Sequence, residues 1–289
     1  MKISVSSYSF SQYIQQGKLT QLSAVAAAHE MGLEAIEFTD LTPPEGVSVA
    51  EYAKQIRAEA DKLGMDINAY TVGANLFQPS PEAEEAEIAR LCAQVDTAAI
   101  LGAKVLRHDV CYTLTGKGAG RSFDAMLPTL AKNARRITEY AATLGIRTCS
   151  ENHGFIAQDS DRVERLINAV GHDNYGALVD MGNFACADED SAMAVSRLAN
   201  FAFHAHAKDF IKRSFAQGPC DGFFQTRGCN YLKGCAIGEG AIPVKQCIAI
   251  LKRAGYDGYL SIEYEGSDDC LRGIRTGFAN LKRYLSELG

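Results

Sequence analysis

The chain has 289 residues, of which 47% are hydrophobic and 22% charged, and its formal net charge is −6. A chain of this length and composition can bury a large core, so disorder is excluded. The negative charge offers no general attraction to nucleic acid or to anionic lipid. We therefore expect one domain, residues 1–289, with no nucleic acid or membrane partner.

The N-terminal residues resemble a strand and not a secretion signal. A strand-like run over residues 3–10 begins almost at Met1, without a basic segment followed by an apolar stretch, and no apolar run reaches membrane-spanning length. We expect a soluble, cytoplasmic protein. Its nine cysteines include no C-x-x-C pair, which favours reduced thiols. Cys220, Cys229 and Cys235 lie in one segment, but their spacing matches no zinc module.

Short β-rich runs alternate with longer segments of helical periodicity along the whole chain. Strands are expected over residues 3–8, 35–39, 66–72, 104–110, 147–152, 175–181, 201–208 and 259–264. Helices are expected over segments such as 19–31, 49–63, 82–101, 123–144 and 242–254. Several helices end at a glycine that leads directly into the next strand, as at Gly64 and Gly102.

Eight such strand–helix pairs predict an α/β fold of the (β/α)₈ TIM-barrel type, because alternating strands and helices give a parallel sheet and eight units close it. The alternative is an open, doubly wound sheet. No G-x-G-x-x-G motif follows the first strand, where a dinucleotide-binding fold would have it. The barrel is therefore favoured.

Four successive strands end on side chains that can bind a metal ion. Glu151 ends the fifth expected strand, Asp180 the sixth, His206 the seventh and Glu263 the eighth. In a (β/α)₈ barrel these ends lie together at one rim. Three carboxylates and one imidazole suit a divalent ion of the Mn²⁺, Mg²⁺, Co²⁺ or Zn²⁺ type. The alternative is that each residue separately forms a salt bridge or hydrogen bond at the barrel mouth.

On these motifs the sequence resembles the sugar phosphate isomerase/epimerase family, the xylose isomerase-like barrels. The resemblance spans essentially the whole chain. Its most specific segments are Ser150-Glu151-Asn152-His153, Val179-Asp180-Met181-Gly182-Asn183, His206-Ala207-Lys208-Asp209, Gly238-Glu239-Gly240 and Ile262-Glu263-Tyr264-Glu265.

The resemblance implies that Glu151, Asp180, His206 and Glu263 bind one divalent metal ion, with Mn²⁺ as the first choice. It also implies that Glu151 and Glu263 flank a bound sugar as an acid/base pair. Asn183 occupies a position where several relatives carry a histidine. That difference argues against a second metal ion, and against the DNA cleavage performed by more distant relatives.

Other polar residues at the expected rim are candidates for substrate binding. His153 shares a strand face with Glu151 and could hydrogen-bond a sugar hydroxyl or brace the ligands. His108 is a weaker candidate for substrate binding. His204 lies one residue pair deeper in the strand than His206, so it is expected to be a buried, hydrogen-bonded histidine and not a ligand. Lys208 could reach substrate oxygens or form a salt bridge with a neighbouring carboxylate.

Residues 210–242 are expected to form a long loop at the barrel mouth. The loop is glycine-rich and aromatic, and Arg227 in it is a candidate contact for an anion or a hydroxyl. The alternative is a contact in a homo-oligomer. A phosphate would meet free helix amides after Gly240, but Glu239 would repel it, which favours an unphosphorylated sugar or polyol.

The function predicted is a metal-dependent isomerase or epimerase that moves protons next to the carbonyl of a ketose or keto-polyol through an enediolate. The first alternative is a metal-dependent lyase, as in inosose and dehydroshikimate dehydratases or in cleavage of keto-C-glycosides. The second alternative is a barrel that binds sugar without catalysis.

Overall fold

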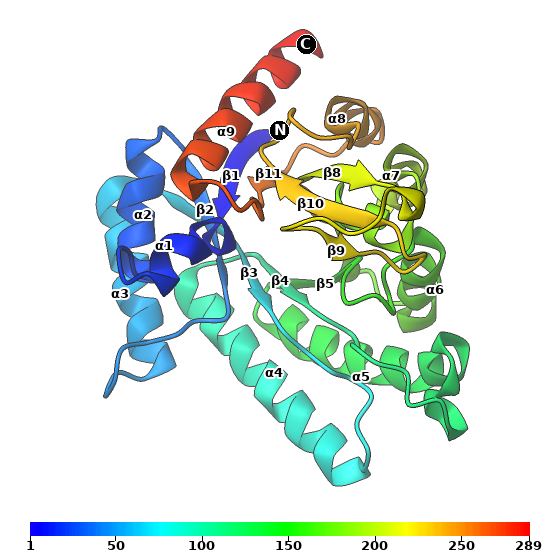
Figure 1. Ribbon diagram of the computed structural model, residues 1–289. Helices are drawn as coiled ribbons and strands as arrows, with labels where there is room; N and C mark the ends of the chain where they lie inside the picture. The colour runs from blue at the N-terminus through cyan, green and yellow to red at the C-terminus, as the bar shows by residue number, and fades with distance from the viewer.

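The computed structural model describes residues 1–289 and contains a closed barrel of eight parallel strands (Figure 1). The strands are β1 (Lys2–Ser6), β2 (Ala35–Thr39), β3 (Asp66–Val72), β4 (Val105–His108), β5 (Arg147–Glu151), β6 (Tyr175–Asp180), β7 (Ala202–Ala207) and β11 (Tyr259–Ile262). Each pairs with its neighbours in the chain, and β1 closes the ring against β11. The predicted (β/α)₈ fold is confirmed.

Helices cover the outside of this barrel (Figure 1). They are α1 (Ser11–Gln15), α2 (Gln21–Glu30), α3 (Val49–Leu63), α4 (Pro81–Leu101), α5 (Phe123–Thr143), α6 (Ser160–Val170), α7 (Ser191–Leu198), α8 (Val244–Arg253) and α9 (Cys270–Glu287). Short 3₁₀ segments are η1 (Ser7–Phe10), η2 (Gly118–Arg121), η3 (Asn183–Ala187), η4 (Ala199–Phe201) and η5 (Phe215–Gln217). No helix has both the length and the apolar character needed to cross a bilayer.

The main core lies between the strands and the surrounding helices. Ile56 of α3, Leu91 of α4 and Leu130 of α5 are fully buried against it, and burial of each such side chain stabilises the fold by roughly 1.5–3 kcal/mol. Gly64 and Gly102 end α3 and α4 in the left-handed conformation, with φ of +66° and +76°. The expected helix–glycine–strand junctions are present there.

Several strands are shorter than expected. The first ends at Ser6 and not at residue 8, because the Ser6 side chain accepts a hydrogen bond from the Tyr8 amide and starts the 3₁₀ turn η1. The fourth covers only Val105–His108 of the expected 104–110, and the eighth ends at Ile262 before Glu263. Glu263 nevertheless continues the strand direction, since its amide donates to the Ala207 carbonyl at 3.0 Å.

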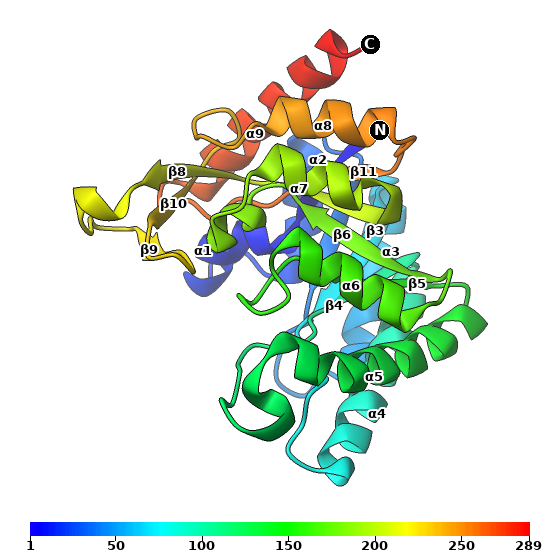
Figure 2. The ribbon, with the colours of Figure 1, turned by 90° about the vertical axis from the view of Figure 1, so that its right-hand side faces the viewer.

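The expectation of a long loop over residues 210–242 is wrong in part. Parts of the segment form a separate antiparallel sheet in the order β8 (Asp209–Arg213), β10 (Tyr231–Cys235) and β9 (Phe224–Gln225). Backbone N–H and C=O groups pair with one another in this sheet, and this pairing stabilises the long segment between β7 and α8. Figure 2 shows the sheet projecting from the side of the barrel.

Candidate metal centre

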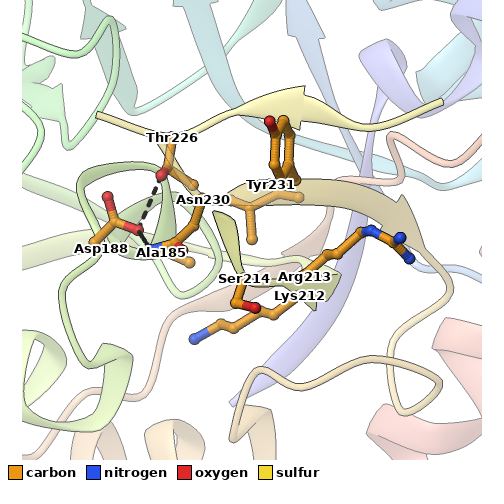
Figure 3. A pocket seen from close by; sticks show the side chains of 9 residues that line it. Ala185, Asp188, Lys212, Arg213, Ser214, Thr226, Asn230 and Tyr231 are labelled. Atoms are coloured by element: carbon orange, nitrogen blue, oxygen red, sulfur yellow. Dashed lines mark hydrogen bonds between the residues drawn. The ribbon is translucent and has the colours of Figure 1, made fainter. Parts of the chain in front are cut away.

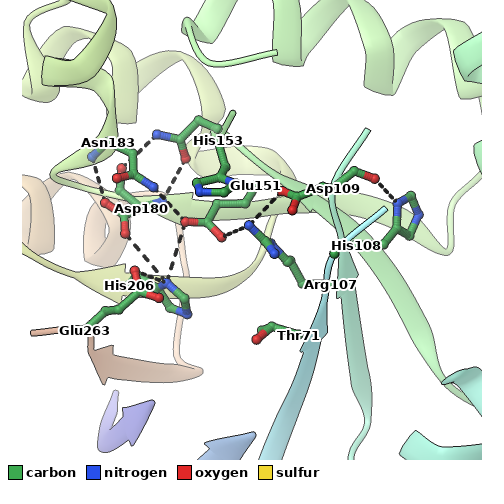
Figure 4. Close-up of polar contacts among 12 residues, drawn as sticks. Thr71, Arg107, His108, Asp109, Glu151, His153, Asp180, Asn183, His206 and Glu263 are labelled. Carbon is green, nitrogen blue, oxygen red and sulfur yellow. Dashed lines mark hydrogen bonds and ion pairs between the residues drawn. The ribbon is translucent and has the colours of Figure 1, made fainter. Parts of the chain in front are cut away.

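Four side chains from four strands meet at the C-terminal end of the barrel (Figure 4). Glu151 is the last residue of β5, Asp180 the last of β6, His206 lies in β7, and Glu263 follows β11. One oxygen or nitrogen atom from each lies within 4.8 Å of the corresponding atom in every other member. The structure therefore brings together the four residues that the sequence predicted as a group.

The spacing of these atoms fits a shared ion. His206 Nδ1 lies 3.3 Å from Glu263 Oε2, 3.6 Å from Asp180 Oδ2 and 3.7 Å from Glu151 Oε1. Ligands about 2.1 Å from one divalent ion lie about 3–4 Å from one another. His206 Nδ1 and Asp180 Oδ2 are also buried without a hydrogen-bond partner. Because orphaned buried polar atoms are costly, a cation between them fits the site.

The backbone after β6 orients Asp180. Its Oδ1 accepts hydrogen bonds from the amides of Gly182 at 2.7 Å and Asn183 at 2.8 Å. These two bonds occupy one carboxylate oxygen and turn the other, Oδ2, toward His206. The turn that begins η3 therefore positions the carboxylate for its neighbours.

Glu37 on β2 is part of the site and was not predicted from the sequence. Its carboxylate is fully buried, 2.8 Å from His206 Nε2 and 2.5 Å from His204 Nε2. Because Glu37 accepts from Nε2 of His206, the other ring nitrogen is left free to face the four-residue cluster. His204 is the buried, hydrogen-bonded histidine that the sequence favoured.

Arg107 on β4 is a second residue that the sequence analysis missed. Its guanidinium is buried, 2.6 Å from Glu151 Oε2 and 2.8 Å from Asp109 Oδ1. Asp109 in turn lies 2.8 Å from Nδ1 of His153. The other oxygen of Glu151 accepts from Asn183 Nδ2 at 2.8 Å. Asn183 and His153 thus lie at the site, as Figure 4 shows.

Lys208 forms a salt-bridge network at the opposite side of the cluster. Its buried amine lies 2.6 Å from Glu263 Oε2, 2.9 Å from Glu265 Oε1 and 3.4 Å from Asp180 Oδ2. Asn183 Oδ1 accepts from the same amine at 3.0 Å. Of the two interpretations of Lys208 that the sequence left open, the structure contains the salt bridge with neighbouring carboxylates.

The surroundings shift the pKa values of the two glutamates in opposite directions. Burial raises the pKa of Glu151 against the opposing charge of Arg107. Burial acts the same way on Glu263, but the charges of Lys208 and His206 outweigh it and hold the pKa of Glu263 well below its usual range. For His206, burial is outweighed by the charges of Glu37 and Glu263, which raise its pKa well above the usual value.

Two predicted substrate-binding residues make their contacts outside the four-residue cluster. His108 is fully buried, with its ring 6.0 Å from the Tyr175 ring, and Figure 4 shows it away from the cluster. Its neighbour Arg107 reaches the cluster instead, because successive residues of a strand point to opposite faces. Arg227 binds Asp159 at 2.7 Å and the Phe155 carbonyl, so its guanidinium is engaged by the loop after β5.

Two cavities adjoin the small β8–β10–β9 sheet. One, of about 340 Å³, includes Lys212 and Arg213 in its lining, and Asp188 at its edge accepts from Thr226 at 2.9 Å (Figure 3). It contains no member of the four-residue cluster. The other, of about 370 Å³, is lined by residues that include Tyr8, Phe224 and Glu265. Since Glu265 contacts Lys208, this second cavity lies beside the cluster.

The closed barrel and the acidic cluster at its mouth define a (β/α)₈ barrel with a site that could bind a metal ion. The chain belongs to the xylose isomerase-like TIM barrel family, whose model matches residues 25–284. The predicted family is therefore confirmed. The family's members include epimerases and dehydratases.

Inosose dehydratase of Lacticaseibacillus casei is 24% identical over 137 residues, which are 47% of this chain and 46% of that protein. The match thus spans about half the length of this curated relative. A xylose isomerase-like barrel protein from Mycobacterium smegmatis, solved with magnesium, is 18% identical, with a TM-score of 0.73 over 100% of this chain and 98% of that one. L-ribulose 3-epimerase is 16% identical, with a TM-score of 0.73 over 99% and 95% of the two chains. These likenesses show the fold.

Proposed function

We propose that this protein is a divalent-metal-dependent isomerase or epimerase that acts on a ketose or keto-polyol. The observation that supports it is the convergence of Glu151, Asp180, His206 and Glu263, with two buried ligand-type atoms left without a hydrogen-bond partner. The same residues would hold the ion, which we expect to be Mn²⁺, with Mg²⁺, Co²⁺ or Zn²⁺ as alternatives. When bound, the ion supplies Lewis-acid polarisation of the substrate carbonyl.

Glu151 and Glu263 are the proposed acid/base pair. Two strands, β6 and β7, separate β5 from β11 in the barrel, so the two carboxylates approach the site from different sides. One removes the proton from the carbon next to the carbonyl, which gives an enediolate, and the other returns a proton to the opposite face. Arg107 and Asn183 hold Glu151 in place, while Lys208 holds Glu263.

Elimination of water is the second candidate reaction, and one observation favours it. The Asp109–His153 pair provides a third proton-transfer group two residues beyond Glu151, with about 43% of the His153 side chain exposed. An acid in this position could protonate a departing β-hydroxyl. The partial match to inosose dehydratase agrees with this second candidate.

Proton exchange in deuterium oxide tests the proposal. The parent protein and Glu263→Gln are incubated with Mn²⁺ and a panel of ketoses, inososes and keto-glycosides. Epimerisation predicts deuterium entering an unchanged carbon skeleton, whereas elimination predicts an ultraviolet-absorbing enone. If Glu263→Gln exchanged protons as fast as the parent, the role of Glu263 would be wrong.

A further inference from the structure

Phe155 has a backbone conformation that bulky residues rarely adopt. It lies in the loop between β5 and α6 with φ of +64°. Left-handed backbone places Cβ close to the following carbonyl oxygen, so glycine is the usual residue there. The residue is only partly buried, since 43% of it is exposed. Much of an apolar ring therefore faces water at a position where glycine would avoid the strain.

Two long side chains hold the backbone of Phe155 on both sides. Its amide donates to Gln158 Oε1 at 2.6 Å, and its carbonyl accepts from Arg227 Nη2 at 2.5 Å. Gln158 is itself buried and donates to the Asn183 carbonyl at 2.8 Å. Arg227 also pairs with Asp159 at 2.7 Å. The conformation is thus fixed by Gln158 of the same loop and by Arg227 between β9 and β10, and Gln158 connects the loop to Asn183 at the candidate metal centre.

The loop that carries Phe155 belongs to the mouth of the barrel. Phe155 follows His153 by two residues and Glu151 by four. An isolated bridge between His153 and Ala157 folds the residues between them into a tight turn. Gly154 in that turn packs on the Tyr112 ring, and Tyr112 donates to Asp109 at 2.7 Å. The backbone that carries the exposed ring is therefore connected, through Gln158 and Asn183, to the polar network around Glu151.

We propose that Phe155 contacts the substrate, stacking its ring on the C–H face of a cyclic keto-polyol or keto-sugar. Arg227 and Gln158 are positioning residues that hold the strained backbone so that the ring stays at the mouth. Strained conformations persist where surrounding contacts impose them, and they concentrate at functional sites. A cyclic substrate presents a flat apolar face to an aromatic ring, whereas a short acyclic ketose presents none. This inference rests on the proposed function and narrows its substrate class.

Binding and stability measurements on a set of variants test this inference. The probes are an inosose, which is a ring, and L-erythrulose, which is too short to close into one, with Mg²⁺ present and saturation-transfer NMR as the readout. The variants are Phe155→Gly, Phe155→Ala, Phe155→Tyr and Arg227→Gln. Phe215→Ala is the matched control, because Phe215 is 63% exposed and has no positive φ.

We expect Phe155→Gly and Phe155→Ala to weaken inosose binding at least fivefold and to leave erythrulose binding unchanged. Phe155→Tyr keeps parental affinity, and Phe215→Ala has no effect. Phe155→Gly melts at a higher temperature than Phe155→Ala, since only glycine relieves the strain. Arg227→Gln alone weakens inosose binding. In the Phe155→Gly background the same change leaves inosose affinity where Phe155→Gly alone puts it, because Arg227 acts through the Phe155 ring.

Three results would overturn the inference. The first is parental inosose affinity in Phe155→Gly, which would leave the proposed function intact if the parent still exchanges the inosose proton. The second is a change in oligomeric mass in Phe155→Gly with unaltered inosose binding, which would make Phe155 a subunit contact. The third is a parent that neither binds nor exchanges inosose. If that parent still exchanges the proton of erythrulose, only the cyclic substrate class is wrong; if it exchanges neither, the proposed function falls as well.

Discussion

Glu37 and His206 stand 169 positions apart in the chain and are joined inside the barrel by a hydrogen bond of 3.0 Å between Oε2 and Nε2. The contact fixes which ring nitrogen faces Glu151, Asp180 and Glu263. We therefore expect Glu37→Gln to lower the affinity for Mn²⁺ by about 10- to 100-fold, the usual effect of removing a carboxylate behind a metal-binding histidine. Isothermal titration calorimetry measures this affinity.

The control for that experiment is Glu30→Gln. Glu30 is an exposed residue at the end of α2, so the same chemical change there should leave Mn²⁺ affinity at the parental value. Parental affinity in Glu37→Gln would show that the hydrogen bond to His206 does not organise the site.

Addition and removal of metal should change the melting temperature. At a free ion concentration about 100 times the dissociation constant, binding stabilises the folded state by about 2.7 kcal/mol. For a chain of this size we expect Mn²⁺ to raise the melting temperature by roughly 4–5 °C, and EDTA to reverse the rise. Asp180→Asn should abolish the response while keeping the Oδ1 contacts to the amides of Gly182 and Asn183. An equal rise in that variant would place the ion elsewhere.

Arg107 is predicted to stabilise the fold as well as to orient the Glu151 carboxylate. Arg107→Met leaves the buried carboxylates of Glu151 and Asp109 without their cation. Breaking a buried pair in this way costs about 3–5 kcal/mol of unfolding free energy, which urea denaturation without metal would detect. Arg136→Met, which breaks an exposed pair with Glu85, should change little. A similar loss of unfolding free energy in Arg107→Met and Arg136→Met would contradict this prediction.

Lowering the pH should reduce the contribution of Asp109 to the stability of the fold. Burial alone would raise its pKa, but the charge of Arg107 and the contact with His153 lower the pKa of Asp109 to about 2. The unfolded value is near 3.9, so this group stabilises the fold above about pH 4 and loses that effect as the pH falls toward 2. We expect Asp109→Asn to be about 2 kcal/mol less stable than the parent at pH 6, with the gap narrowing below pH 4. A gap that stays constant with pH would exclude this linkage.

The metal-type residues could be predicted because each stands where a barrel strand ends, and the C-terminal ends of all eight strands share one rim. Glu37 could not be recognised in the same way, because it lies in the middle of β2, two residues before the strand ends. The only signal was a single charged residue in an otherwise uncharged strand. Its role depends on His204 and His206, which only the closed barrel brings to it.

His108 was a candidate and Arg107 was missed, because the face on which a strand residue lies depends on strand register, which the sequence does not contain. In the structure Arg107 lies opposite Cys149 and His108 opposite Ser150. Neighbours in a parallel sheet point to the same face, so Arg107 shares the inward face of Cys149 and Glu151. A shift of one residue exchanges the two faces. The contacts of Arg227 could not be predicted for a similar reason, since its partners Phe155 and Asp159 are distant in the chain.

Anomalous scattering from crystals soaked in Mn²⁺ tests the central claim most directly. The account predicts a single peak per chain, bounded by Glu151, Asp180, His206 and Glu263 and lost in Asp180→Asn. A second group of metal-binding type, Glu37, His204 and His206, lies deeper in the barrel and supplies the alternative position. A peak there, or no peak at the four-residue cluster, would contradict the account.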